Sequence, residues 1–202
     1  MEIILIPCCK RKVIGGARDF QLSGLADVLN AATYSRLMEA RFDLAKQLGL
    51  QPGPDLGFQG KSENIAYLPA YKRYDGVIYR TGDVRDRFNK FNGRLIILSA
   101  LYGLLEANDT IRNYDLAMTD SLPMHTRVST FWQKHGLREI IEEYYLGWES
   151  ATLHDLLSNN YRKALEPWPA PKIILYHPYN YPGLRTASNI PRGEDLKRLL
   201  SY

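Results

Sequence analysis

Residues 95–116 read Leu-Ile-Ile-Leu-Ser-Ala-Leu-Tyr-Gly-Leu-Leu-Glu-Ala-Asn-Asp-Thr-Ile-Arg-Asn-Tyr-Asp-Leu and hold the clearest structural signal in the chain. The apolar run from Arg94 to Ala100 is typical of a strand that is buried on both faces, and this favours a central place in a sheet. Small and polar residues follow at once, and Gly103 lets the backbone turn sharply. A plain core does not need such a cluster. We therefore expect a functional site to begin where this strand ends.

The size and composition of the chain favour a soluble globular protein. Its 202 residues are 45% hydrophobic and 24% charged, which matches one well-packed domain spanning 1–202 and argues against disorder. The formal net charge of +4 permits contact with phosphate-bearing partners but identifies none. The oligomeric state cannot be inferred from these properties.

Neither a membrane span nor a cofactor site is expected from the sequence. The apolar runs are far shorter than the roughly 18–20 residues of a membrane helix, and no basic segment precedes the first of them. We therefore expect a cytoplasmic protein without membrane contact. The two cysteines, Cys8 and Cys9, are adjacent, a spacing that suits neither a disulfide framework nor a zinc site. We expect no metal and no cofactor.

Apolar patterns predict strands and helices that alternate along the chain. Such alternation indicates an α/β (mixed α+β) fold with a central sheet flanked by helices. The region 51–71, rich in proline and glycine, reads as a long loop. Strands are expected at 2–7, 94–100 and 172–177, and helices at 31–48, 127–146 (interrupted at Gly136) and 151–165.

Each predicted strand is followed by residues that carry functional groups. If the strands are parallel, their carboxyl ends meet at one edge of the sheet, where ligands commonly bind. Cations next to Cys8 favour its thiolate, although an inert buried thiol is the commoner case. Lys10 is the better candidate, as an anchor for phosphate or carboxylate. The candidates are Cys8 and Lys10 after the first strand, Ser99 and Tyr102 after the second, and His177 after the third.

Two aspartates after the second strand are candidates for general acid–base chemistry. Asp109 and Asp115 can act as acid and base or bind sugar hydroxyls, and they can equally form turns and pair with nearby cations. Ser99 lacks the glycine two residues before it that a hydrolase nucleophile elbow requires, so capping a helix is an equal alternative for it. Packing is the corresponding alternative for Tyr102.

The stretch 71–94 combines basic and aromatic residues in the way that a nucleic-acid groove does. Arg80, Arg85 and Arg87 would contact phosphates, and the interleaved tyrosine and phenylalanine rings would stack on bases. A solvated amphipathic helix with its rings in the core explains the same pattern. The sequence leaves both interpretations open.

The order of motifs resembles that of the peroxide-stress YaaA family and its smaller relatives. The strand and turn at 6–10 are similar to the family's opening strand with its Ser-Pro-Ala-Lys turn, and 76–82 is similar to its Gly-x-Val-Tyr segment. The closest match is the segment 98–105, and the segment 109–118 follows it at a spacing similar to that in the family. Phe131-Trp132 is similar to the family's aromatic pair. The resemblance covers most of 1–145 and implies a YaaA-like α/β fold with a positively charged cleft, DNA binding and protection from peroxide.

Two functions follow from these observations. The first is a YaaA-like protein whose basic cleft binds nucleic acid or a nucleotide, with phosphates on Lys10, Arg80, Arg85 and Arg87. The second is an enzyme that acts on a nucleobase, nucleoside or nucleotide, with a site built from Lys10, Ser99, Tyr102 and the two aspartates. The helix-hairpin-helix that family members use on DNA has no counterpart at 51–69, and Cys8-Cys9 replaces the family's serine-containing turn.

Overall fold

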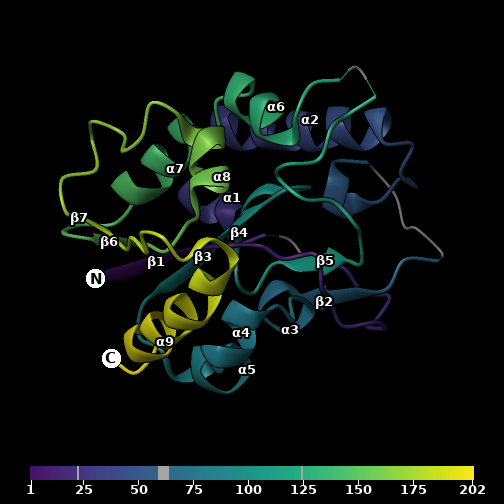
Figure 1. Cartoon of the computed structure of the whole chain (residues 1–202). Helices are drawn as coiled ribbons and strands as arrows, with labels where there is room; N and C mark the ends of the chain where they lie inside the picture. Colours follow the sequence, from purple (N-terminus) through teal and green to yellow (C-terminus); the bar gives the residue numbers. More distant parts are fainter. Residues whose placement is uncertain (22, 59–63, 124) are drawn as a thin grey trace.

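A five-stranded mixed sheet crosses the middle of the protein (Figure 1). The computed structural model describes residues 1–21, 23–58, 64–123 and 125–202. The strands lie in the order β4-β3-β1-β6-β7; β3, β1, β6 and β7 are parallel, and β4 is antiparallel to β3. Their bounds are β1 (Glu2–Pro7), β3 (Arg94–Ser99), β4 (Gly103–Glu106), β6 (Thr152–Asp155) and β7 (Tyr176–Pro178).

The first strand lies at the centre of this sheet. Ile3 of β1 pairs with Arg94 of β3, and Ile4 pairs with His154 of β6. The four apolar side chains of 3–6 are fully buried, because a parallel strand with neighbours on both edges is covered by helices on both faces. The strands predicted at 2–7 and 94–100 are thereby confirmed, the second ending one residue earlier.

Helices cover both faces of the sheet. Figure 1 shows α2, α6 and α7 on one side and α4, α5 and α9 on the other. This arrangement confirms the mixed α/β fold with a central sheet flanked by helices. The helices are α1 (Leu25–Val28), α2 (Ala31–Gln47), α3 (Ala70–Arg73), α4 (Val77–Thr81), α5 (Val84–Arg87), α6 (Val128–Lys134), α7 (Leu137–Leu146), α8 (Asn159–Arg162) and α9 (Asn189–Leu199).

Local signals explain the longest helix. The side chain of Asn30 accepts a hydrogen bond from the Thr33 amide and so caps the start of α2, and Gly49 follows its end with a φ of +62°. The helix predicted at 31–48 is thus confirmed to within one residue. The helices predicted around Gly136 are also present, as α6 and α7.

Three expectations need correction. Residues 152–155 form strand β6 and not the start of a helix, because they pair with β1 on one edge and β7 on the other. The last strand begins at Tyr176, since the Ile173 amide bonds to the Ala170 carbonyl in a turn. The stretch 71–94 folds as the short helices α3, α4 and α5, broken at Gly76 and at Asp83, whose φ is +49°.

A second, two-stranded sheet lies outside the first. It pairs β2 (Tyr67–Pro69) with β5 (Thr110–Arg112) in antiparallel fashion. The predicted loop at 51–71 thus contains a strand as well as a 3-10 turn at Pro54–Leu56, while 59–63 lie outside the described residues. Further 3-10 turns occur at Phe88–Lys90, Lys163–Leu165 and Arg185–Ser188.

A buried ion pair joins the small sheet to the 3-10 turn. The Asp55 carboxylate accepts from Arg112 Nε at 2.8 Å and Nη2 at 2.6 Å. It also accepts from the hydroxyls of Tyr67 at 3.0 Å and Tyr102 at 2.6 Å. Asp55 is only 1% exposed. Four donor groups from three residues supply the hydrogen bonds that a charge removed from water requires.

The turn between β3 and β4 is packed against a tryptophan. Gly103 has a φ of +69°, and a Cβ placed on it would lie 2.6 Å from a ring carbon of Trp132. The indole of Trp132 is fully buried, and its Nε1 donates to the Ala100 carbonyl at 2.7 Å. Glycine is therefore required here for two reasons, the backbone conformation and the close approach of the ring.

Candidate functional site

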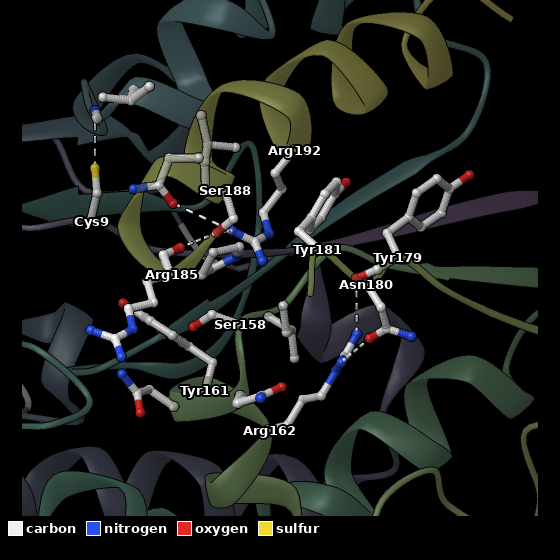
Figure 2. A pocket seen from close by; sticks show the side chains of 18 of the residues that line it. Cys9, Ser158, Tyr161, Arg162, Tyr179, Asn180, Tyr181, Arg185, Ser188 and Arg192 are labelled. Carbon is white, nitrogen blue, oxygen red and sulfur yellow. Dashed lines mark hydrogen bonds between the residues drawn. The ribbon is translucent and has the colours of Figure 1, made fainter. Parts of the chain in front are cut away.

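A pocket of about 810 Å³ opens over the carboxyl edge of the sheet. Its floor is formed where β1, β6 and β7 end, and its walls come from α8 on one side and α9 on the other (Figure 2). The first turn of α4 closes a third side. The lining segments are Pro7–Cys9, 76–78, 157–162, 179–183 and parts of 185–192. Parallel strands converge at this edge, which is the usual ligand position in open α/β sheets.

The charged groups that line the pocket are all arginines. Arg162 approaches from α8 and Arg192 from α9, while Arg185 precedes the latter helix (Figure 2). Among the described residues that line the cavity, none is acidic. The interior of the pocket is therefore cationic.

Arg162 is held in place by a carboxylate beneath the pocket floor. Its Nε donates to Asp155 Oδ2 at 2.8 Å, and its Nη1 donates to Asn180 Oδ1 at 2.8 Å. Asp155 ends β6, is fully buried, and also accepts from the Tyr176 hydroxyl at 2.6 Å and the Leu157 amide at 2.7 Å. Asp155 thus fixes both the loop after β6 and the direction of Arg162.

Arg192 has no such carboxylate partner among the described residues. Its Nη1 donates to Ser188 Oγ at 2.9 Å and more weakly to Asn189 Oδ1 at 3.4 Å. The guanidinium lies 4.7 Å from the ring centre of Tyr181. Arg192 is 4% exposed, and its Nε is buried without a hydrogen-bond partner. Burial lowers the pKa of this arginine.

Neutral polar and aromatic groups complete the lining. Rings of Tyr161, Tyr179 and Tyr181 surround the space, and the Tyr161 hydroxyl donates to the Cys8 carbonyl at 2.9 Å. Aromatic faces and amide side chains are the groups that stack on bases and bind their edges. The amides come from Asn159, Asn160, Asn180 and Asn189.

The two cysteines lie at the base of the pocket. The Cys8 sulfur is 3.2 Å from the Tyr161 hydroxyl and accepts weakly from the Ala100 amide at 3.4 Å. The Cys9 sulfur lies against Gly76, whose amide donates to it at 3.1 Å. Burial, with the neighbouring Cys8, raises the pKa of the Cys9 thiol to about 12. Cys9 therefore stays a neutral thiol near pH 7, a poor nucleophile.

Ser99 and Tyr102 lie in the core and not in the pocket. Both are fully buried. Ser99 Oγ is 2.9 Å from the Tyr114 hydroxyl, which is 2.7 Å from that of Tyr74, and the Tyr102 hydroxyl donates to Asp55. The polar cluster after β3 is thus satisfied by internal hydrogen bonds. The catalytic roles expected for Ser99 and Tyr102 stay predictions, and neither residue lines the pocket.

Asp109 also has internal partners. Its carboxylate accepts from Ser23 Oγ at 2.8 Å, from the Glu106 amide at 2.9 Å and from the Gly24 amide at 3.2 Å. It thereby ties the turn between β4 and β5 to the start of α1. Burial raises the pKa of Asp109 to about 6, against the opposing effect of Arg41.

This raised pKa predicts a pH-dependent contribution to stability. The folded-state pKa exceeds the unfolded value of about 3.9. Stability from Asp109 is therefore fully present below pH 4 and is lost as pH rises to 6, by about 3 kcal/mol over the two units. Urea unfolding of the wild type and Asp109→Asn at pH 4 and pH 7 tests this. Between pH 4 and pH 7, we expect the free energy of unfolding of Asp109→Asn to rise by about 3 kcal/mol relative to that of the wild type. If the difference between the two proteins is the same at both pH values, the prediction is wrong.

The other candidates lie on the surface and are not among the residues that line the pocket. Lys10 Nζ is 3.2 Å from Asp120 and 3.7 Å from Asp115, so Asp115 forms part of an exposed ion-pair cluster. Arg85 pairs with Asp75, and Arg87 pairs with Asp83. Arg80 is exposed on α4, and His177 stacks on His154. Of the ten candidate residues, only Cys8 lines the pocket.

Sequence reasoning missed the residues that give the pocket its charge. Arg162 comes from the segment 151–165, which was predicted to be a helix, and no element was predicted for the segment that carries Arg185 and Arg192. A signal was present in Ser158-Asn-Asn-Tyr-Arg, a polar run directly after Leu153–Leu157. It becomes informative only when residues 152–155 are recognised as a strand.

The described residues hold no group of three or more metal-ligating side chains. In the same part of the chain, every helix is too short or too polar to cross a bilayer.

Comparison with known proteins identifies one family. The sequence profile of the family described as "Peroxide stress protein YaaA" matches residues 18–178, which include β3 to β6 and the α8 wall of the pocket. No curated protein matches the chain at a significant level. Because the match covers well over half of the sequence, the chain belongs to the peroxide stress protein YaaA family.

Proposed function

We propose that this protein binds a nucleotide or a segment of nucleic acid in the pocket over β1, β6 and β7. Membership of the YaaA family supports a role in oxidative stress. The observation that carries the proposal is the pocket's charge: three arginines and, among its described lining residues, no acidic side chain. Such a lining favours an anionic ligand, and phosphate is one of the anions that arginine binds in two-pronged geometry.

The remaining lining fits the other parts of a nucleotide. Tyrosine rings offer stacking surfaces, and the asparagine amides offer both donors and acceptors to a base. The volume of about 810 Å³ lies within the range of about 300–1,000 Å³ that is usual for small-ligand pockets. One nucleotide unit can enter it, whereas a duplex would have to remain at the rim.

The chemistry of the lining supports binding more than catalysis. Glycosidic-bond or base-modifying reactions commonly need a carboxylate or imidazole within reach of the reacting atoms. The described lining contains neither, and Asp155 is engaged by Arg162 below the floor. The Cys9 thiol stays protonated near pH 7. A small-molecule enzyme therefore has less support in this geometry than a binding protein.

Isothermal titration with nucleotides, single-stranded DNA and duplex DNA at two salt concentrations tests the proposal. We expect binding that weakens as salt rises, because each phosphate neutralised releases counterions. Arg185→Gln should weaken it at least several-fold, since Arg185 is exposed at the pocket and forms no ion pair with the described residues.

Arg80→Gln is the matched control, an exposed arginine on α4 outside the pocket. It should leave the affinity unchanged. If Arg80→Gln weakens binding and Arg185→Gln does not, the phosphates are bound by the surface arginines of 71–94, and the pocket is not the binding site. If no nucleotide or nucleic acid binds at low salt, the proposed function is wrong.

A further inference from the structure

One wall of the pocket lies beyond the segment that matches the family. The match ends at residue 178, whereas Tyr181, Arg185, Ser188 and Arg192 come from the last part of the chain. Ser188 directly precedes α9 and Arg192 lies in its first turn; α9 is an eleven-residue helix that packs on α4. This wall is therefore a feature that family membership by itself does not predict.

Arg192 presents an unused pair of donors in this wall. Its hydrogen bonds to the described residues all come from Nη1, which faces Ser188 and Asn189. Nε is buried without a partner. The Nε and Nη2 hydrogens point in the same direction, and this edge of a guanidinium binds two oxygens of one oxyanion. Figure 2 shows the group between Tyr181 and Ser188, facing the pocket.

The start of α9 adds to the attraction for an anion. No side chain caps its first turn: the Ser188 hydroxyl donates to the Arg185 carbonyl and accepts from Arg192 Nη1. The first turn of a helix carries a partial positive charge, which favours phosphate, although in α9 Pro191 has no amide to contribute. A buried arginine without a counter-ion and an uncapped helix start thus converge on one position.

The geometry points to a terminal phosphate monoester as the group held here, and we propose that Arg192 and the first turn of α9 bind the 5′-phosphate of one nucleotide. This inference rests on the proposed function. Arg192 is almost fully excluded from solvent, so a phosphate at the end of a molecule can approach it more easily than one with chain on both sides. The nucleotide can be free in solution or stand at the end of a single strand, and the phosphate chemistry is the same.

Titration calorimetry with matched pairs of ligands tests this assignment. We expect each nucleoside 5′-monophosphate to bind at least tenfold tighter than its nucleoside, and a 5′-phosphorylated oligonucleotide tighter than its 5′-hydroxyl form if strand ends are the source. Arg192→Met should remove the advantage of the phosphate and leave the nucleoside affinity unchanged. Arg198→Met, the same substitution on an exposed residue of α9, should change neither.

Stability provides a second readout for the same variants. Replacing a buried, unpaired charge by an apolar side chain of similar length should keep or raise the melting temperature. A folded Arg192→Met that has lost phosphate discrimination would support a ligand-binding role over a structural one. If this variant does not fold, Arg192→Lys keeps the charge but loses the two-pronged edge, and it should reduce the advantage several-fold.

Two outcomes separate this inference from the proposed function. Nucleosides that bind as tightly as their monophosphates would overturn the Arg192 assignment and leave nucleotide binding intact. Unchanged phosphate discrimination in a folded Arg192→Met would do the same. If the wild-type protein binds neither nucleotides nor nucleic acid, both the Arg192 assignment and the proposed function are wrong.

Discussion

Asp55→Asn is expected to lower the free energy of unfolding by about 3–5 kcal/mol, the usual range when one partner of a buried ion pair is removed. The substitution leaves the Arg112 guanidinium, which is nearly fully buried, without its counter-charge. It also replaces an acceptor of four hydrogen bonds with a group that accepts fewer. Urea unfolding followed by circular dichroism measures the change.

Two further variants separate the buried pair from a general effect of charge. Asp43→Asn changes an exposed aspartate of α2 and should alter stability by no more than about 0.5 kcal/mol. The double variant Asp55→Asn/Arg112→Met removes both charges and should recover part of the loss. A loss below about 1 kcal/mol for Asp55→Asn alone would show that the pair is not important for stability.

Gly103→Ala should destabilise the protein by about 2–5 kcal/mol. A left-handed backbone conformation costs a non-glycine residue about 1–2 kcal/mol, and overpacking a rigid core costs about 1–3 kcal/mol more. The new Cβ would meet the Trp132 ring at 2.6 Å. The ring cannot move freely, because its Nε1 is bonded to Ala100 and its surroundings are filled.

Gly49→Ala isolates the backbone contribution. Gly49 has a similar φ of +62°, and a Cβ there would meet no atom within 4 Å. This control should cost only about 1 kcal/mol. Thermal and urea unfolding of the two variants would contradict the role of Trp132 if their losses were equal.

The apolar pattern was sufficient to predict the centre of the fold. The strands at 2–7 and 94–99 and the helix at 31–47 follow from long apolar runs and from local caps. Strand β6 was missed because Thr-Leu-His-Asp is short and half polar. Its extended form depends on β1 and β7, partners more than 20 residues away on either side, which a local pattern does not contain.

The candidate site was harder to predict for a related reason. A polar cluster after an apolar strand, such as Ser99 and Tyr102, signals either a ligand site or an internal hydrogen-bond network. The distinction depends on whether partners such as Tyr114 and Asp55 reach it, and those contacts are set by tertiary packing. The pocket arginines Arg162 and Arg192 are brought together by tertiary packing, since Arg162 follows β6 and Arg192 lies on α9, which packs on α4.

The central place of β1 bears on how the protein is made. Its neighbours in the sheet, β3 and β6, are encoded about 90 and 150 residues later. During translation β1 therefore has neither strand partner until β3 has emerged, and its second edge stays unpaired until Asp155 has emerged. While β1 is unpaired, its isoleucines are exposed in the nascent chain, and exposed apolar segments favour aggregation. We therefore expect chaperones that bind apolar segments near the ribosome to bind this part of the chain.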